Sequence, residues 1–228
     1  MSRWALWLPL LMVPACSDLT EGAGGVIALQ VTDPPADEIE VGQSMTLTAV
    51  GLDKDGNPIP AAVTWRAPDP TLIVDPTTGV ITGVAPGIGR VQAFADQLGS
   101  NVLQFTVLSR ADTLIVTDSV FTVAPGLNSP PLVAQLQTFT PPGQGVAGRP
   151  VVYTITSPPD VPPPTVELPG AVRTLTVNTG TDGAVSSVTL NRVLTVAQPD
   201  TAIVDVRAFR PDGSLVPGSG QRFIILLQ

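Results

Sequence analysis

Residues 90–95, Arg-Val-Gln-Ala-Phe-Ala, and residues 103–107, Leu-Gln-Phe-Thr-Val, decide the fold that the sequence predicts. Apolar residues occupy positions 91, 93 and 95 of the first segment and positions 103, 105 and 107 of the second. A period of two is typical of a strand with one buried face, because successive side chains of a strand point to opposite sides. The segments therefore predict two short strands, separated by turn residues at Gly99–Ser100.

The same alternation recurs along residues 26–108. Further strands are predicted over 27–32, 45–49 and 63–65, with turn-forming residues at 33–35, 53–58, 75–79 and 85–89. Short strands at regular spacing, with Gly, Pro and Asp between them, favour an antiparallel β-sandwich. No window beyond the N-terminus has a sustained period of 3.6 residues, so almost no helix is expected.

Residues 26–108 resemble the group 2 bacterial immunoglobulin-like domains of intimins and many surface proteins. The matching segments follow one another in the expected order: Glu40-Val41-Gly42-Gln43 before Met45-x-Leu47, Asp53-Lys54-Asp55-Gly56-Asn57-Pro58, Val63-Thr64-Trp65, Val74-Asp75, Thr78-Gly79-Val80-Ile81-Thr82-Gly83, Gly87-x-Gly89-x-Val91 and Phe105-Thr106-Val107. The resemblance implies an immunoglobulin-like fold. It says little about function, because functional sites are added to folds.

A second domain is predicted over residues 113–228, after a polar linker at 109–112. Its order of strands and glycine-containing turns echoes the first domain, which indicates a divergent internal repeat. Residues 132–153 and 181–190 resemble the invasin-type (group 1) immunoglobulin-like domains, although Gln137 stands where that family has an acid. Proline cannot donate a sheet hydrogen bond, so the proline-rich stretches 138–145 and 157–164 must be loops or sheet edges. The predicted fold class is all-β, with two immunoglobulin-like antiparallel sandwiches in tandem.

Composition narrows the chemistry that the 228 residues can perform. The net charge is −8 and the 11 basic residues are scattered, whereas nucleic-acid binding requires a clustered positive surface, so no nucleic-acid partner is expected. Histidine, the commonest general base and metal ligand, is absent. Cys16 is the single cysteine, so the chain forms no intramolecular disulfide.

The N-terminus has the three parts of a secretory signal: Arg3, the apolar run Trp4–Val13, and Pro14-Ala15-Cys16. The run is shorter than the about 20 residues that span a bilayer. Val13-Pro14-Ala15-Cys16 resembles the lipobox of bacterial lipoproteins, with Pro14 departing from the pattern. This resemblance implies a signal peptide over 1–15, a diacylglyceryl group on Cys16, and a tether over 16–25. The chain is then expected in the cell envelope, at the outer membrane or cell surface, with the membrane as a partner through Cys16.

An ordinary signal peptide with an incidental cysteine is the alternative. Against it, Cys16 ends the apolar run and precedes a polar segment, and Ser17 resembles an outer-membrane sorting residue.

Two further motifs have both a structural and a functional interpretation. Trp65 is either a core tryptophan of the sandwich or a stacking platform for a sugar, and its place beside Val63 on a central strand favours the core. Asp53–Asn57 has acids at alternate positions, as in a calcium loop. The twelfth position of such a loop is a glutamate, whereas here it is Thr64, so a hairpin turn is favoured and no metal site is expected.

No catalytic group of residues stands out. A serine–lysine pair could use only Lys54, which lies in a predicted turn. Asp200 and Asp205 are expected on opposite faces of a strand. The acids at positions 33, 37, 38 and 40 are expected in a solvated loop. No cofactor and no enzymatic activity are therefore predicted.

Three functions stay open at the level of sequence. The first is a structural or adhesive surface module that binds a protein or polysaccharide ligand or acts as a spacer. The second is a carbohydrate-binding accessory protein that uses Trp65 and Tyr153, and burial of both would remove its platforms. The third is an enzyme based on two carboxylates, which needs an exposed pocket that holds both.

Overall fold

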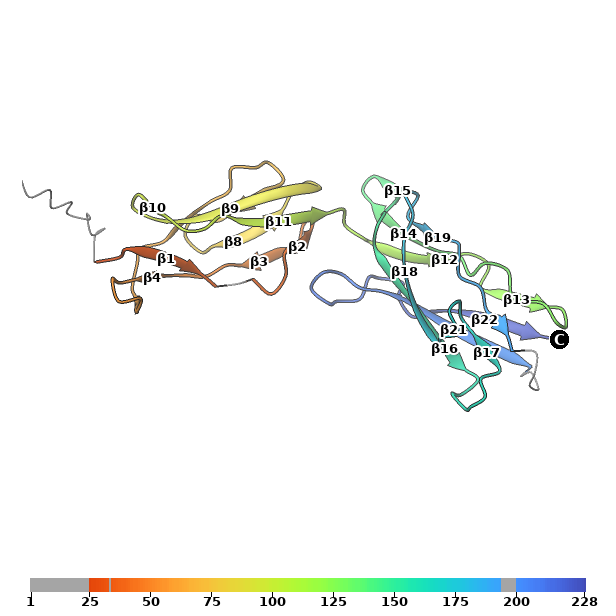
Figure 1. Cartoon of the computed structure of the whole chain (residues 1–228). Coiled ribbons are helices and arrows are strands. Elements are labelled where there is room, and N and C mark those ends of the chain that lie inside the picture. Colours follow the sequence, from red (N-terminus) through yellow and green to blue (C-terminus); the bar gives the residue numbers. More distant parts are fainter. Residues whose placement is uncertain (1–24, 33, 194–199) are drawn as a thin grey trace, which may run out of the picture.

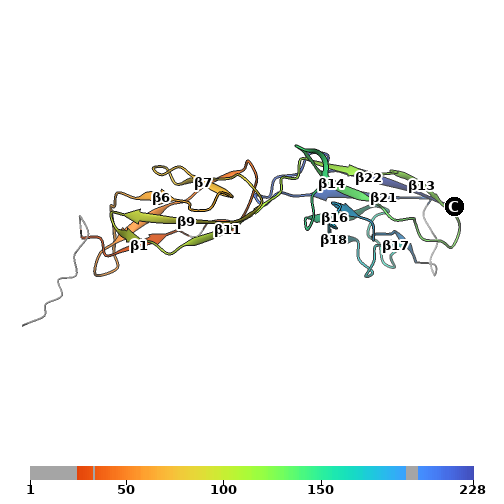
Figure 2. The ribbon, with the colours of Figure 1, turned by 90° about the horizontal axis from the view of Figure 1, so that it is seen from above.

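The computed structural model describes residues 25–32, 34–193 and 200–228, and this part of the chain contains strands and no helix. Two sandwiches follow one another end to end, the second inclined to the first, with β1 near one end of the molecule and the C-terminus at the other (Figures 1 and 2). The prediction of two immunoglobulin-like β-sandwiches in tandem is confirmed. None of the described segments is a helix long and apolar enough to cross a membrane.

The first sandwich consists of a mixed sheet packed against shorter antiparallel sheets. Its mixed sheet has the order β10-β9-β11-β2, with β6 also paired to β9, and the opposing strands form the sheets β1-β4-β5 and β3-β8-β7. The strands are β1 (Ala28–Val31), β2 (Glu38–Glu40), β3 (Ser44–Thr46), β4 (Ala49–Leu52), β5 (Pro58–Ile59), β6 (Thr64–Arg66), β7 (Leu72–Val74), β8 (Val80–Gly83), β9 (Gly87–Ala95), β10 (Leu98–Gly99) and β11 (Leu103–Leu108).

The second sandwich has a five-stranded sheet in the order β13-β22-β21-β16-β18, opposed by β12-β14-β15 with β19 paired to β14, and by the pair β17-β20. The strands are β12 (Thr113–Val116), β13 (Val120–Val123), β14 (Ala134–Phe139), β15 (Pro142–Gly145), β16 (Pro150–Ser157), β17 (Val166–Glu167), β18 (Thr174–Asn178), β19 (Ala184–Val185), β20 (Asn191–Arg192), β21 (Thr201–Ala208) and β22 (Gln221–Leu227).

The two sandwiches begin in the same way, which agrees with the internal repeat. In each, the first strand pairs antiparallel with one sheet, β1 with β4 and β12 with β14. The next strand then crosses to the other sheet and pairs parallel with the last strand of its sandwich, β2 with β11 and β13 with β22.

Each sandwich has its own hydrophobic core. Ile39, Trp65 and Phe105 are buried in the first core, and Tyr153 and Phe223 are buried in the second, where their rings stack at 6.4 Å. Trp65 is 4% exposed, which confirms it as a core residue. The Tyr153 hydroxyl donates a hydrogen bond to the Leu132 carbonyl at 3.1 Å, so this buried polar group has a partner.

The proline-rich segment 138–145 forms a tight turn and an edge strand. The turn is at Thr140–Pro141, and Pro142–Gly145 forms β15. β15 ends its sheet and pairs only with β14, and an edge strand tolerates a residue that cannot donate a hydrogen bond. The expectation of a loop or edge here is therefore confirmed.

Gly79 closes the turn between β7 and β8 and contacts Trp65. Its φ is +71°, and a Cβ built on it would lie 2.6 Å from the Leu47 carbonyl oxygen and 2.7 Å from Trp65 Nε1. Gly56, in the turn between β4 and β5, has a φ of +80° and no atom within 4 Å of such a Cβ. The two glycines share a backbone conformation and differ in the space around them.

We expect Gly79→Ala to destabilise the first domain more than Gly56→Ala does. Both substitutions place an alanine at positive φ, which costs about 1–2 kcal/mol. Only Gly79→Ala also forces backbone and the Trp65 ring apart, an added cost of about 1–3 kcal/mol. Denaturant unfolding followed by Trp65 fluorescence measures the difference, and equal losses for the two variants would contradict the packing of Trp65 against Gly79.

Tyr153 should resist ionisation until the second domain unfolds. Burial raises its pKa well above the usual 10.0, because the charged phenolate loses its hydration. The folded pKa is raised, so this stabilising contribution is complete below pH 10 and is lost as the pH rises further. Tyr153 is the only tyrosine, so tyrosinate absorbance reports it alone. We expect its ionisation to coincide with loss of β-sheet circular dichroism, and ionisation near pH 10 in the folded chain would contradict its burial.

Candidate functional site at the domain junction

The aromatic residues proposed as sugar platforms do not offer their faces to solvent. Tyr153 is fully buried. Trp65 borders a shallow hollow with Pro68 and Pro70, but at 4% exposure only its edge reaches the hollow. The carbohydrate-binding alternative therefore loses the two side chains on which it depended.

Asp53 organises a turn. Its carboxylate accepts hydrogen bonds from the backbone amides of Asp55 and Asn57 at 2.9 and 2.8 Å, and these bonds lower the pKa of Asp53, with that of Asn57 largest. A carboxylate occupied in this way acts as the turn-forming group that the sequence favoured. Among the residues that the structure describes, no cluster of three or more acidic or cysteine side chains could hold a metal ion.

The paired carboxylates of the enzyme alternative do not meet. Asp200 is exposed and precedes β21, whereas Asp205 lies within β21 and is buried beneath arginines. Asp205 is 3.0 Å from Arg222 Nε and 3.6 Å from Arg207 Nη2. Asp205 therefore belongs to a local ion-pair group, separate from Asp200.

The acidic segment before β3 differs from the predicted solvated loop at two residues, because Glu38 and Glu40 both lie in β2. Asp33 lies outside the described residues, and Asp37 and Glu38 are exposed, as expected for a solvated segment. Glu40 was assigned to the same solvated loop, and this was wrong: it ends β2 and is 1% exposed. The local sequence pattern did not predict the burial of Glu40, because the residues that cover it lie more than 100 positions away in the chain.

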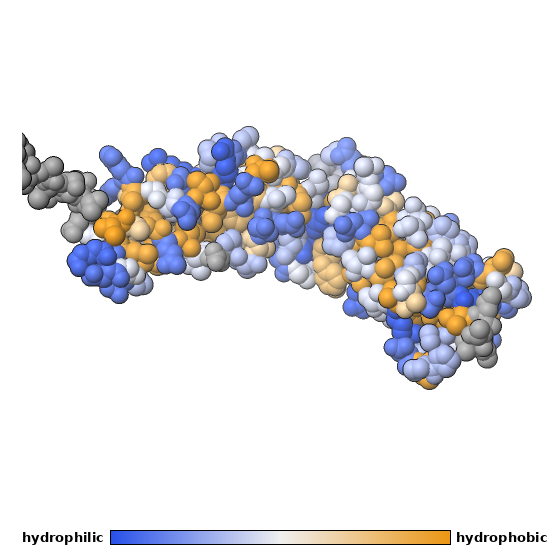
Figure 3. Space-filling model, in the orientation of Figure 1, coloured by the Kyte–Doolittle hydropathy of each residue, from blue (hydrophilic) through white to orange (hydrophobic). Residues whose placement is uncertain are grey.

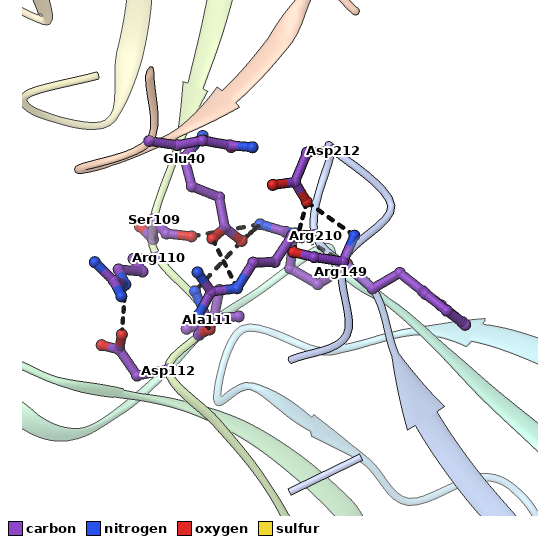
Figure 4. A network of polar contacts seen from close by, with 12 residues as sticks. Glu40, Ser109, Arg110, Ala111, Asp112, Arg149, Arg210 and Asp212 are labelled. Atoms are coloured by element: carbon purple, nitrogen blue, oxygen red, sulfur yellow. Dashed lines mark hydrogen bonds and ion pairs between the residues drawn. The ribbon is translucent and has the colours of Figure 1, made fainter. Parts of the chain in front are cut away.

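The residues that cover Glu40 come from the second domain. Its Oε1 lies 2.6 Å from Arg149 Nη1, and its Oε2 lies 3.7 Å from Arg210 Nε. The side chains of Arg149 and Glu40 are only 6% and 1% exposed. Figure 4 shows the carboxylate between the two guanidinium groups. We call Glu40, Arg149 and Arg210 the junction cluster.

The arginines of the junction cluster also hold the linker backbone. Arg149 Nη1 donates to the Ser109 carbonyl at 3.4 Å, and Arg210 Nη2 donates to the Ala111 carbonyl at 3.2 Å. The Ala111 amide in turn donates to Glu40 Oε1 at 3.4 Å. The cluster therefore joins the first domain, the linker and the second domain through the Glu40–Arg149 ion pair and these hydrogen bonds. The facing Glu40 Oε2 and Arg210 Nε atoms, 3.7 Å apart, make no hydrogen bond.

Local structure positions each arginine. Arg149 precedes β16, where its amide donates to Thr179 Oγ1 at 3.0 Å and its carbonyl accepts from the Thr179 amide at 2.9 Å. Arg210 begins the tight turn between β21 and β22, closed by the hydrogen bond that the Arg210 amide donates to the Ser214 carbonyl at 2.8 Å. That loop reaches back toward the first domain (Figure 1).

A second contact crosses the junction beside the cluster. Hydrogen bonds from Ser214 lower the pKa of Asp212, with a smaller contribution from the Gln43 side chain of the first domain. Gln43 also accepts a bond from the Glu40 amide at 3.0 Å. Gln43 and Asp212 both line the hollow beside the cluster, so the loop that carries Arg210 lies against the first domain there.

Two hollows flank the junction cluster, each lined by both domains. One, of about 350 Å³, lies between Glu38 and Asp212, and the other, of about 580 Å³, lies between Pro86 and Phe139. Two-carboxylate catalysis requires an acid with a raised pKa, whereas the pKa of Asp212 is lowered. The geometry therefore supports mechanical connection of the domains better than acid–base chemistry.

The sequence carried only a weak signal for this site. Arg149 and Arg210 each precede a proline, in the pairs Arg149-Pro150 and Arg210-Pro211, and neither residue is marked by spacing as a partner of Glu40. Cys16, the predicted lipidation site, lies outside the described residues.

Comparison with known proteins gives a likeness of fold. No protein-family model matches the chain, and no curated protein matches it. Among solved structures, the Yersinia pseudotuberculosis adhesin InvE is 13% identical, over 91% of this chain and 61% of its own, with a TM-score of 0.43. Domains 4 and 5 of the S-layer protein SbsC are 17% identical over 89% and 98%, with a TM-score of 0.35. Fibronectin(III)-like modules of Clostridium thermocellum CbhA are 15% identical over 88% and 94%, with a TM-score of 0.42. This chain spans about three fifths of the InvE structure.

Proposed function

We propose that the chain is a non-catalytic structural module of the bacterial cell envelope, tethered to a membrane by a lipid on Cys16. The observation that carries this proposal is the end-to-end arrangement of two sandwiches whose junction is held by the buried ion pair of Glu40 with Arg149. Strand β1 lies near one end of the molecule and the C-terminus at the other (Figure 1). An anchor before β1 would therefore place the second domain farthest from the membrane.

The adhesive form of this proposal is favoured by an apolar row on the second domain. Val120 and Ile224 are register partners on β13 and β22, and they are 57% and 37% exposed. Leu226, two residues farther along the same face of β22, is 40% exposed. Figure 3 shows hydrophobic residues at the surface of both domains, in patches interrupted by hydrophilic ones. An exposed apolar row on the domain farthest from the anchor would suit contact with a protein or polysaccharide ligand.

The anchor is tested by metabolic labelling with a fatty acid. We expect the wild-type chain to carry the label and to sediment with membranes, because two or more acyl chains give stable anchoring. Cys16→Ser should abolish both, and Ser17→Ala should keep the label. An unlabelled wild-type chain, or a Cys16→Ser chain that still sediments with membranes, would refute the anchor.

The adhesive role is tested by Ile224→Lys, with Ile73→Lys as the control. Ile73 is 58% exposed on β7 of the first domain, so both substitutions place a charge at an exposed isoleucine. Only the first changes the apolar row. The test uses the Cys16→Ser chain, so that the lipid does not hold it on membranes. If the row binds a ligand, this chain with Ile224→Lys should lose most of its retention on isolated cell envelopes, while the same chain with Ile73→Lys is retained as well as the Cys16→Ser parent. Equal retention of both variants would exclude the row as a contact surface and leave the spacer role.

A further inference from the structure

The ion-pair partners that cover the Glu40 carboxylate come from the second domain, not from its own. Ile39 and Glu40 are neighbours on β2, so their side chains point to opposite faces. Ile39 is 0% exposed in the first core, whereas the ion-pair partners of Glu40 are Arg149 and Arg210 of the second domain. The 1% exposure of Glu40 therefore depends on the two domains keeping their present orientation.

Charged groups are suited to fixing an orientation because their contacts are directional. Arg149 reaches Glu40 while two of its nitrogens donate to the Ser109 and Phe209 carbonyls, at 3.4 and 3.3 Å. Rotation of one domain would separate the carboxylate from Arg149 and leave charges buried without partners, a strongly unfavourable state. Apolar contacts alone would tolerate sliding far better.

The position of a hinge follows from the linker. Ala111 is 0% exposed and belongs to the second core, and Leu108 ends β11 of the first sandwich. Only Ser109 and Arg110 lie between these two residues. Without the cluster, rotation about these two residues would move the domains and leave both cores intact.

We propose that Glu40 is an orientation lock: its carboxylate holds Arg149 and Arg210, and neutralising it converts the rigid junction into a hinge at Ser109–Arg110. Each sandwich has a separate core, so an unpaired buried arginine is relieved most easily by opening the junction to water, with no need for unfolding. This lock refines the proposed structural role but does not depend on it, because it needs neither the lipid on Cys16 nor a ligand.

The lock is tested by measuring the distance between the domains with spin labels. Cys16→Ser removes the natural cysteine, and Thr46→Cys on β3 and Thr176→Cys on β18 place one label on an exposed strand position of each domain. Pulsed electron–electron double resonance on this labelled chain should give one narrow distance distribution. Glu40→Gln should shift the closed-to-open equilibrium by about 100- to 1,000-fold, equivalent to about 3–4 kcal/mol, and so broaden the distribution.

The control is Asp69→Asn. It removes a carboxylate that pairs with Arg90 at 2.8 Å within the first domain, away from the junction, and should leave the distribution narrow. The unfolding midpoint of each domain should stay close to that of the labelled parent in Glu40→Gln. If Glu40→Gln fails to fold, Glu40→Asp is measured in its place. Aspartate keeps the charge but is shorter by one methylene, so the same broadening of the distance distribution is expected.

A double-mutant cycle distinguishes the lock from general loosening. Arg149→Gln alone should also broaden the distribution, and Glu40→Gln combined with Arg149→Gln should broaden it less than the sum of the single changes, since no charge of that pair is then left unmatched. Three results would overturn the proposal: a broad distribution in the labelled parent, an unchanged width in the folded Glu40 variant, or additive effects in the cycle. Loss of membrane attachment in Cys16→Ser would leave all these widths unchanged.

Discussion

The parallel pairing of β2 with β11 is the constraint on which the arrangement of the molecule depends. It closes the first sandwich by carrying the chain from one sheet to the other, and it aligns Glu40 with Leu108 at the end of the last strand. The chain leaves the first domain at that point. Glu40 is therefore beside the linker and within reach of the second domain, while Ile39, one residue earlier, secures the same strand in the core.

The two hydrophobic cores and the domain junction are stabilised by different kinds of interaction. Each core is held by the alternating inward faces of its strands, around Phe105 in one and Tyr153 and Phe223 in the other, and no disulfide is available to a chain with one cysteine. The junction relies on a carboxylate, two guanidinium groups and the linker carbonyls. Buried ion pairs add little net stability compared with apolar packing, but they penalise alternative orientations. Folding and domain orientation can therefore respond separately to substitution.

A fixed orientation would matter for the proposed module, with one end anchored at a membrane. Two sandwiches joined by a free hinge would sample many directions, whereas a locked pair keeps a defined reach and presents one face outward. Only about four residues join the sandwiches, so a small number of contacts near Ser109 and Arg110 control the direction of the whole second domain.

The sequence by itself determined the fold class, the near absence of helix, the core position of Trp65 and the turn at Asp53. Each of these follows from local alternation or turn chemistry, which a strand or turn expresses wherever it lies. It also pointed to Cys16 as an anchor, a prediction that concerns residues outside the described structure. Only the tertiary structure decided that Glu40 is buried, that Tyr153 cannot serve as a platform, and that Pro142–Gly145 forms an edge strand. The physical reason is that the burial of Glu40 is produced by residues more than 100 positions away, and the alternation of a three-residue strand does not reveal which distant surface will cover its outer face.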